Sequence, residues 1–276
     1  MRTSRRSSPT RRLRALELGT FYSELDRLYG EPEADVEGFL REALRRARLV
    51  RDERAVASVA NELGSVLRLR GELRESEGLY DEVLRALEAT GADERDVARA
   101  LVNLGDVYVA QGRNAAAIEA FDRAERMLGD GDENRLELSA ICNNRSSAYR
   151  GLGRFSDARA DLRRAGRLLD GVPGTEGKRA TNAINLAQVL TDEGRIEEAA
   201  EVIAKALVTY ETLGGGRDVH RPHALATAAR IAYLRGDYAA AEAHYLKAAE
   251  VLREKLGDSP NADALERRAG EMRALR

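Results

Sequence analysis

Three asparagines occupy the same place in a repeated stretch of sequence and could carry binding chemistry. Asn103, Asn144 and Asn185 are spaced 41 residues apart, with Glu62 and Thr227 at the matching places before and after them. An amide side chain both donates and accepts hydrogen bonds, so it can pair with the backbone of an extended polypeptide whatever the side chains of that polypeptide are. The three residues are therefore candidates for one row of backbone-binding groups.

Further polar side chains lie at helical spacings from these asparagines. Offsets of three or four residues place side chains on one face of a helix. The partner-binding set that we predict contains, besides the three asparagines, Arg68, Arg99, Arg150, Arg230, Gln188 and Tyr233. Arginines outnumber the acids Asp106 and Asp192 on this face, and guanidinium groups bind carboxylates and phosphates through paired N–H donors. We expect an acidic or phosphorylated extended segment as the guest. In the alternative interpretation, the amides and arginines bond within the protein itself.

Motifs that would indicate catalysis or metal binding are incomplete. The segment 171–178 resembles a phosphate loop, but five residues instead of four separate its outer glycines, and Arg179 follows its lysine. His220 and His223 have no evident third metal ligand. Cys142 lies on the apolar stripe of its helix, where a small core side chain is expected. We therefore predict no enzyme activity, no catalytic residue, no cofactor and no metal.

A set of glycines gives the frame in which these side chains must be positioned. Six of them lie 41 or 42 residues apart: Gly30, Gly71, Gly112, Gly153, Gly194 and Gly236. A fixed period of this length marks stacked supersecondary units. Around each of the last five glycines, a small residue stands seven before and five after, and a large apolar residue stands nine after. This spacing predicts a helix on either side of each glycine, with the glycine supplying the positive φ that a helix end often needs.

The repeat resembles the tetratricopeptide repeat. The segments Asn103–Tyr108 and Gly236–Ala241 carry the resemblance, which covers residues 54–256 well and the first unit, around Gly30, weakly. The chain departs from the family in lacking tryptophan and the repeat-ending proline, and its period exceeds the usual length of about 34 residues. Such longer repeats are similar to those of kinesin light chains and of many bacterial signalling proteins.

The resemblance implies an all-α fold, an α-solenoid of about six antiparallel helix pairs in a superhelix, whose concave groove is lined by the first helix of each pair. We expect the solenoid over residues 12–256 and a C-terminal capping helix over 257–276. Its first unit should hold helices at 12–29 and 33–51. Residues 1–11 form a basic arm, which we expect to be disordered. We expect no nucleic-acid partner for the chain, and the arginine-rich arm is a weak exception to this expectation.

Composition limits the class of protein further. The chain has 276 residues, 33% of them charged, and a formal net charge of −2, which gives no general affinity for nucleic acid. No apolar run is long enough to cross a membrane. A single cysteine excludes a disulfide within the chain and fits a reducing cytoplasm. Arginine outnumbers lysine 41 to 4, as in proteins of GC-rich bacteria.

These features together predict a cytoplasmic, bacterial, non-enzymatic adaptor or scaffold. Its partner would be a protein or an extended acidic peptide bound in the concave groove. One alternative stays open: a regulatory or sensor module that binds a signalling peptide or controls a partner protease or transcription factor in trans. An enzyme is the least favoured hypothesis, because no catalytic constellation is present in the sequence.

Overall fold

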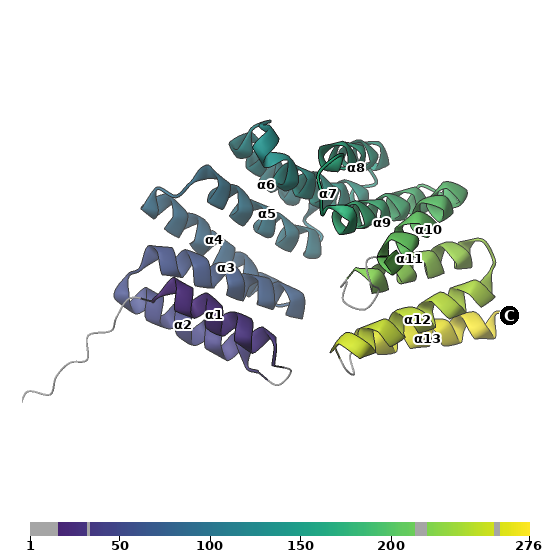
Figure 1. Ribbon diagram of the computed structural model, residues 1–276, viewed down its shortest axis with the longest axis horizontal. Helices are drawn as coiled ribbons and strands as arrows, with labels where there is room; N and C mark the ends of the chain where they lie inside the picture. Colours follow the sequence, from purple (N-terminus) through teal and green to yellow (C-terminus); the bar gives the residue numbers. More distant parts are fainter. Residues whose placement is uncertain (1–15, 32–33, 213–219, 257–259) are drawn as a thin grey trace, which may run out of the picture. The chain divides into compact units, whose positions relative to one another are not determined.

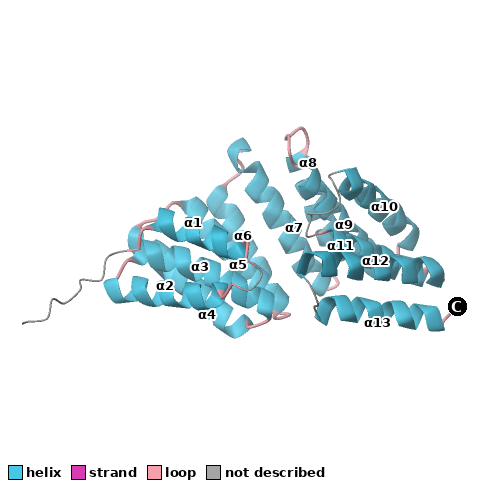
Figure 2. Cartoon of the chain, turned by 60° about the horizontal axis from the view of Figure 1, so that its bottom comes forward, coloured by secondary structure: helices cyan, strands magenta, loops and turns pink. Residues whose placement is uncertain are grey.

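The computed structural model describes residues 16–31, 34–212, 220–256 and 260–276, and this part of the chain contains 13 α-helices and no strand (Figures 1 and 2). The all-α prediction is therefore confirmed. The predicted arm at residues 1–11 and the start of the predicted capping segment at 257–259 lie outside the described residues. None of the described helices is long and apolar enough to cross a membrane.

The chain divides into two compact units, one ending at Arg113 and the other beginning at Asn114. The first unit contains α1 (Leu18–Tyr29), α2 (Val36–Val50), α3 (Glu53–Arg70), α4 (Leu73–Thr90) and α5 (Glu94–Ala110). The second unit contains α6 (Asn114–Leu128), the short 3-10 helix η1 (Asp132–Asn134), α7 (Arg135–Gly151), α8 (Phe155–Leu169), α9 (Glu176–Asp192), α10 (Ile196–Thr212), α11 (Arg221–Leu234), α12 (Tyr238–Leu256) and α13 (Pro260–Ala274).

Within each unit, helices that follow one another across a glycine turn pack as antiparallel pairs. In the first unit α3 lies along α4, and in the second unit α7 lies along α8, α9 along α10 and α11 along α12 (Figure 1). Each first helix also contacts the first helix of the next pair within its unit: α3 contacts α5, α7 contacts α9, and α9 contacts α11. This is the stacking of helix pairs expected for a solenoid of repeats.

Five of the six marker glycines have the predicted left-handed backbone. Their φ angles lie between 70° and 83°: Gly71, Gly112, Gly153, Gly194 and Gly236. The prediction is wrong for Gly30, which has a φ of −80° and a right-handed conformation. There the Gly30 N–H bonds to the Arg27 carbonyl and the Glu31 N–H bonds to the Leu28 carbonyl, both at 3.1 Å, so the right-handed turn continues through the glycine.

Small side chains allow the two helices of a pair to approach closely. A Cβ atom on Gly64 would lie 3.0 Å from the ring of Tyr80, which is fully buried. Ser76, at the small position of the second helix, donates a hydrogen bond of 2.7 Å to the Gly64 carbonyl. The large apolar positions of the other repeats are buried as well: Phe121, Leu162, Ile203 and Tyr245. The repeated pattern of small and large residues is therefore the packing interface.

The ends of the fold depart from the regular repeat. The described part of α1 begins at Leu18, later than the predicted residue 12, and α2 begins at Val36. Asp35 precedes α2 as its N-cap, and its carboxylate accepts the Gly38 N–H at 2.8 Å. At the other end α13 packs against α12, with Ala269 and Met272 buried against Tyr245. The predicted capping helix is confirmed.

Candidate partner-binding site

Most of the sequence-predicted binding residues lie on one face of the second unit. The helices α7, α9 and α11 lie side by side there, with α9 in contact with both of the others. Side chains three or four residues apart on each helix point to the same side. We call this surface the polar face of unit 2, and it consists of Asn144 and Arg150 on α7, Asn185, Gln188 and Asp192 on α9, and Thr227, Arg230 and Tyr233 on α11.

Gln188 connects the three helices of the polar face. Nη1 of Arg150 donates a hydrogen bond to Oε1 of Gln188. Nε2 of Gln188 in turn donates to Oγ1 of Thr227 at 3.2 Å. The amide therefore uses one donor and one acceptor within the protein and keeps further hydrogen-bonding capacity.

Two guanidinium groups of the polar face share one carboxylate. Oδ1 of Asp192 lies 2.7 Å from Nη2 of Arg230, and Oδ2 lies 3.5 Å from Nε of Arg150. The three charges leave an excess of one positive charge. Burial lowers the pKa of the Arg150 guanidinium, an effect that Asp192 opposes and Arg230 reinforces. Because an arginine remains charged at neutral pH, this half-buried cation attracts an anion more strongly than a fully solvated one would.

The row of asparagines divides into two kinds. Asn185 donates through Nδ2 to Oδ1 of Asn143 at 3.3 Å, and in the first unit Asn103 donates to Oδ1 of Asn61 at 2.9 Å. Both therefore bond to a neighbouring helix of their own unit. Asn144, by contrast, makes no side-chain hydrogen bond to the described residues of unit 2, and its side chain is half-buried. Of the three amides, Asn144 has the most capacity left for a partner.

The remaining predicted residues have different surroundings. Arg99 pairs with Asp96 on its own helix at 3.1 Å, with the Arg99 side chain 65% exposed. Arg68 is half-buried and forms no ion pair among the described residues. Tyr233 is 42% exposed, and its ring centroid lies 6.0 Å from that of Tyr238. An exposed aromatic ring three residues after Arg230 on the same helix suits an apolar contact with a partner.

Sequence reasoning missed the acceptors Asn61 and Asn143. The amide of Asn143 is buried and also accepts a hydrogen bond from Nδ2 of Asn182 at 3.2 Å. A signal was present in the sequence, because each acceptor precedes its donor by 42 residues. Two asparagines that lie about one repeat length apart indicate a hydrogen bond between the first helices of neighbouring repeats.

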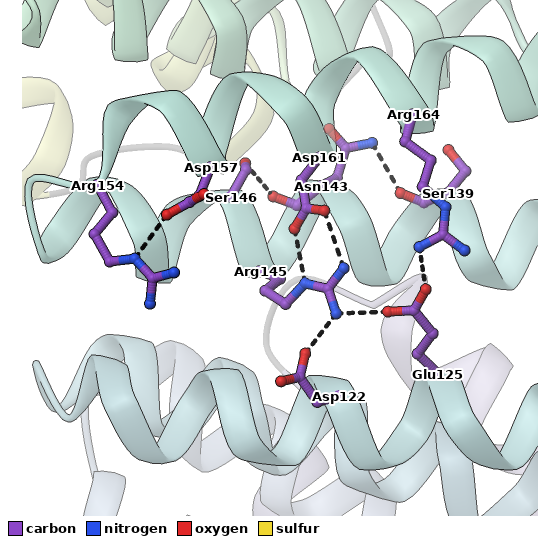
Figure 3. A network of polar contacts seen from close by, with 10 residues as sticks. All are labelled: Asp122, Glu125, Ser139, Asn143, Arg145, Ser146, Arg154, Asp157, Asp161 and Arg164. Carbon is purple, nitrogen blue, oxygen red and sulfur yellow. Dashed lines mark hydrogen bonds and ion pairs between the residues drawn. The ribbon is translucent and has the colours of Figure 1, made fainter.

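A buried ion network around Arg145 was also missed (Figure 3). The Arg145 side chain, on α7, is only 8% exposed. Its Nε and Nη2 donate to the two oxygens of Asp161 on α8 at 2.7 and 2.9 Å. Its Nη1 donates to Asp122 and Glu125 on α6, both at 2.5 Å. Arg164 donates to Glu125 from the other side. One arginine thus connects three helices.

The sequence contained a signal for this network too. In the repeat around Gly153, Arg145 stands eight residues before the glycine. The other repeats carry apolar side chains at the same position: Leu63, Leu104, Leu186 and Ala228. Eight residues after the glycine, three of them carry Leu79, Ala120 and Val202 where this repeat has Asp161. Opposite charges at two matching core positions indicate that they pair, because an unpaired buried charge is too costly to keep.

Cys142 is fully buried in the same region, as the sequence predicted for a core side chain. Burial raises the pKa of its thiol to about 11, and the charge of Asp161 adds to the effect. The thiol therefore stays protonated near neutral pH, which makes it a poor nucleophile.

Comparison with known proteins identifies the family. The family model of the tetratricopeptide repeat matches residues 55–130 and 178–254, more than half of the chain. The chain therefore belongs to the tetratricopeptide repeat family. Members of this family are in general non-enzymatic scaffolds that bind other proteins, and membership does not specify a partner.

Several solved structures share the fold. BtubC (BKLC) from P. vanneervenii has a TM-score of 0.63 at 19% identity, covering 86% of this chain and 94% of that one. The kinesin light chain-like repeats of Podosopora anserina have a TM-score of 0.53 at 17% identity over 72% of this chain and 96% of theirs. The apo form of RapI has a TM-score of 0.59 at 15% identity, covering 93% of this chain and 73% of that one. No curated protein matches the sequence.

Proposed function

We propose that the chain is a non-catalytic adaptor that holds an extended acidic segment of a partner protein on the polar face of unit 2. One observation carries the proposal: Arg150 and Arg230 share the single carboxylate of Asp192, so this face has an excess of positive charge. Two adjacent guanidinium groups can bind the carboxylates of a guest through paired N–H donors.

The neighbouring side chains support an extended guest. The Asn144 amide has no partner among the described residues of unit 2 and lies one to two turns from Arg150 on α7, and Gln188 retains hydrogen-bonding capacity between the arginines. Side-chain amides at such spacings can bond to the backbone of a guest whatever its side chains are. Bonds to the guest backbone would then give affinity, and contacts with its side chains would give specificity. Tyr233 adds an exposed ring at the end of α11. Ordering a flexible segment offsets part of the contact energy, so we expect a Kd on the order of micromolar.

The test uses a designed acidic probe, since the natural partner is not identified. A fluorescein-labelled decapeptide of alternating glutamate and glycine is titrated with the full chain and followed by fluorescence anisotropy. The glutamine–glycine and lysine–glycine decapeptides are the matched probes. We expect binding of the glutamate peptide only, weakened at least about tenfold in the double variant Arg150→Gln, Arg230→Gln, because each charge-assisted bond contributes on the order of one factor of ten.

A matched control separates local recognition from a general charge effect. Arg123 and Arg126 on α6 are exposed and form no ion pair among the described residues, so Arg123→Gln, Arg126→Gln removes the same charge elsewhere. It should leave the affinity within about twofold at moderate ionic strength. Equal losses in the two double variants, or equal binding of the glutamine peptide, would refute the proposal.

The asparagines provide a second test. Asn144→Asp places a negative charge on the polar face without breaking an internal bond, so we expect weaker binding of the acidic probe and an unchanged melting temperature. Asn185→Asp removes the donor to Asn143, and we expect a lower melting temperature. If Asn144→Asp destabilises the chain as much as Asn185→Asp, the amide of Asn144 has an internal role and the proposal loses one of its binding groups.

A further inference from the structure

The first unit contains a pocket that the proposed function does not use. It has a volume of about 520 Å³ and lies among α1, α3, the end of α4 and the start of α5. Pockets that bind small molecules have volumes of roughly 300–1,000 Å³ and combine an apolar lining with a few polar groups. The size of this pocket therefore fits a small molecule.

Part of the pocket lining is apolar, beside polar residues that include Tyr22, Ser58 and Asn61. Ala57 of α3, Val83 and Leu87 of α4 and Ala100 of α5 form the apolar part, and all but Leu87 are buried. Thr90 also lines the pocket, but its hydroxyl donates to the carbonyls of Ala86 and Leu87 in its own helix. Thr90 therefore adds no unsatisfied hydroxyl next to the apolar side chains.

The charged groups of the pocket are all engaged except one. Asp96 pairs with Arg99 at 3.1 Å. Asp93 caps α5 by accepting the Arg95 N–H at 2.9 Å, and the positive end of the helix offsets its charge. Arg54, in the first turn of α3, is exposed and forms no ion pair in the described part of the chain. The available guanidinium can bind an anionic group at the edge of an apolar pocket.

We propose that this pocket binds a free small-molecule carboxylate with an apolar body, whose hydrocarbon part lies on the Ala57–Val83–Leu87–Ala100 wall and whose carboxylate bonds to Arg54. A guanidinium presents two N–H donors in the geometry that a carboxylate accepts. The apolar wall contributes to affinity because it removes the hydrocarbon part of the ligand from water. A small hydrophilic acid has no hydrocarbon part and would not gain this free energy. The proposal concerns the first unit alone and stands apart from the polar face of unit 2.

Octanoate is a suitable probe, with 1-octanol and octylamine as matched neutral and cationic compounds. Isothermal titration of the full chain should show saturable binding of one octanoate per chain. The two matched compounds should bind at least about tenfold more weakly, because they lack the charge-assisted bonds to Arg54. Arg54→Gln should weaken octanoate binding by about the same factor. Arg74→Gln should have no effect. Arg74 is another exposed arginine of the first unit and forms no ion pair with the described residues.

A filling variant tests the location independently of charge. Ser58 lines the pocket and is half-buried, so Ser58→Phe should occupy part of the volume and abolish binding while circular dichroism and melting remain those of the parent. Absence of saturable octanoate binding, or binding unchanged in both Arg54→Gln and Ser58→Phe, would overturn the proposal. A peptide with C-terminal leucine that binds more tightly than octanoate, and that loses binding in Arg54→Gln, would overturn the assignment to a free small molecule.

Discussion

The buried network around Arg145 yields a prediction that can be worked out from its contacts. Replacing Arg145 with methionine keeps much of the side-chain volume and removes the charge. Three carboxylates lose a partner, but not equally. Glu125 keeps its hydrogen bond from Arg164, and the Asp122 side chain is 38% exposed and can be solvated. Asp161 is only 11% exposed and is left with a buried, unpaired charge.

The expected cost follows from this asymmetry. Removing one partner of a buried ion pair costs about 3–5 kcal/mol, because the remaining charge is uncompensated. The second variant Asp161→Leu in the Arg145→Met background replaces the ion pair with apolar side chains, and such replacements are often neutral. We therefore expect urea unfolding, followed by circular dichroism, to show a loss of about 3–5 kcal/mol for Arg145→Met and recovery of more than half of it in the double variant.

The pH dependence gives an independent check of the same reasoning. Burial raises the pKa of the Glu125 carboxyl, but Arg164 and Arg145 lower it by more, so its pKa lies below the ordinary value. This contribution to stability is present above the ordinary pKa and is lost as the pH falls. Arg145→Met removes one of the two cations that lower the pKa of Glu125, so the variant loses part of this contribution. The difference in stability between parent and variant should therefore shrink as the pH falls through and below the ordinary carboxyl pKa of about 4.3.

Two results would refute this account. One is a cost below about 1 kcal/mol for Arg145→Met, which would mean that water or rearrangement replaces the arginine. The other is a double variant less stable than Arg145→Met alone, because then Asp161 would not be the source of the cost.

Three further predictions concern separate features. Gly64→Ala should destabilise the first unit by about 1–3 kcal/mol in urea unfolding, because the new Cβ would lie 3.0 Å from the Tyr80 ring. Gly78→Ala, in a helix with no atom within 4 Å of the new Cβ, should instead be stabilising by about 0.5–1 kcal/mol. Asp192→Asn should raise the affinity of the alternating glutamate–glycine peptide by about threefold to tenfold in anisotropy, because the two arginines of the polar face lose their internal carboxylate. Cys142 should react with Ellman's reagent at pH 8 at least about 100-fold more slowly than in urea, because burial raises its pKa to about 11 from 9.0.

Each of these has an outcome that would contradict it. Equal effects of the two glycine changes would mean that the close helix approach at Gly64 is unimportant. Unchanged or weaker peptide binding in Asp192→Asn would show that Asp192 holds the arginines in position instead of competing with the guest. Rapid labelling of the native thiol would show that α7 opens readily around Cys142.

The sequence by itself determined the helical repeat, because its signals are local and periodic. Five glycines at 41- or 42-residue spacing predicted five left-handed turns, and residues at fixed offsets from them predicted the buried small and large positions. Gly30 was the exception. A glycine permits positive φ but does not require it, and only the hydrogen bonds of its own turn decide the conformation.

Tertiary structure decided which polar side chains are available. Asn103, Asn144 and Asn185 are equivalent in the sequence, yet two of them bond to an asparagine on a neighbouring helix and Asn144 does not. Arg150 and Arg230 come together at Asp192 only because α7, α9 and α11 pack side by side. A periodic sequence specifies the face of the helix on which a side chain lies. Whether that side chain forms a hydrogen bond depends on distances of a few ångströms between separate helices. The repeat length gives no information about these distances.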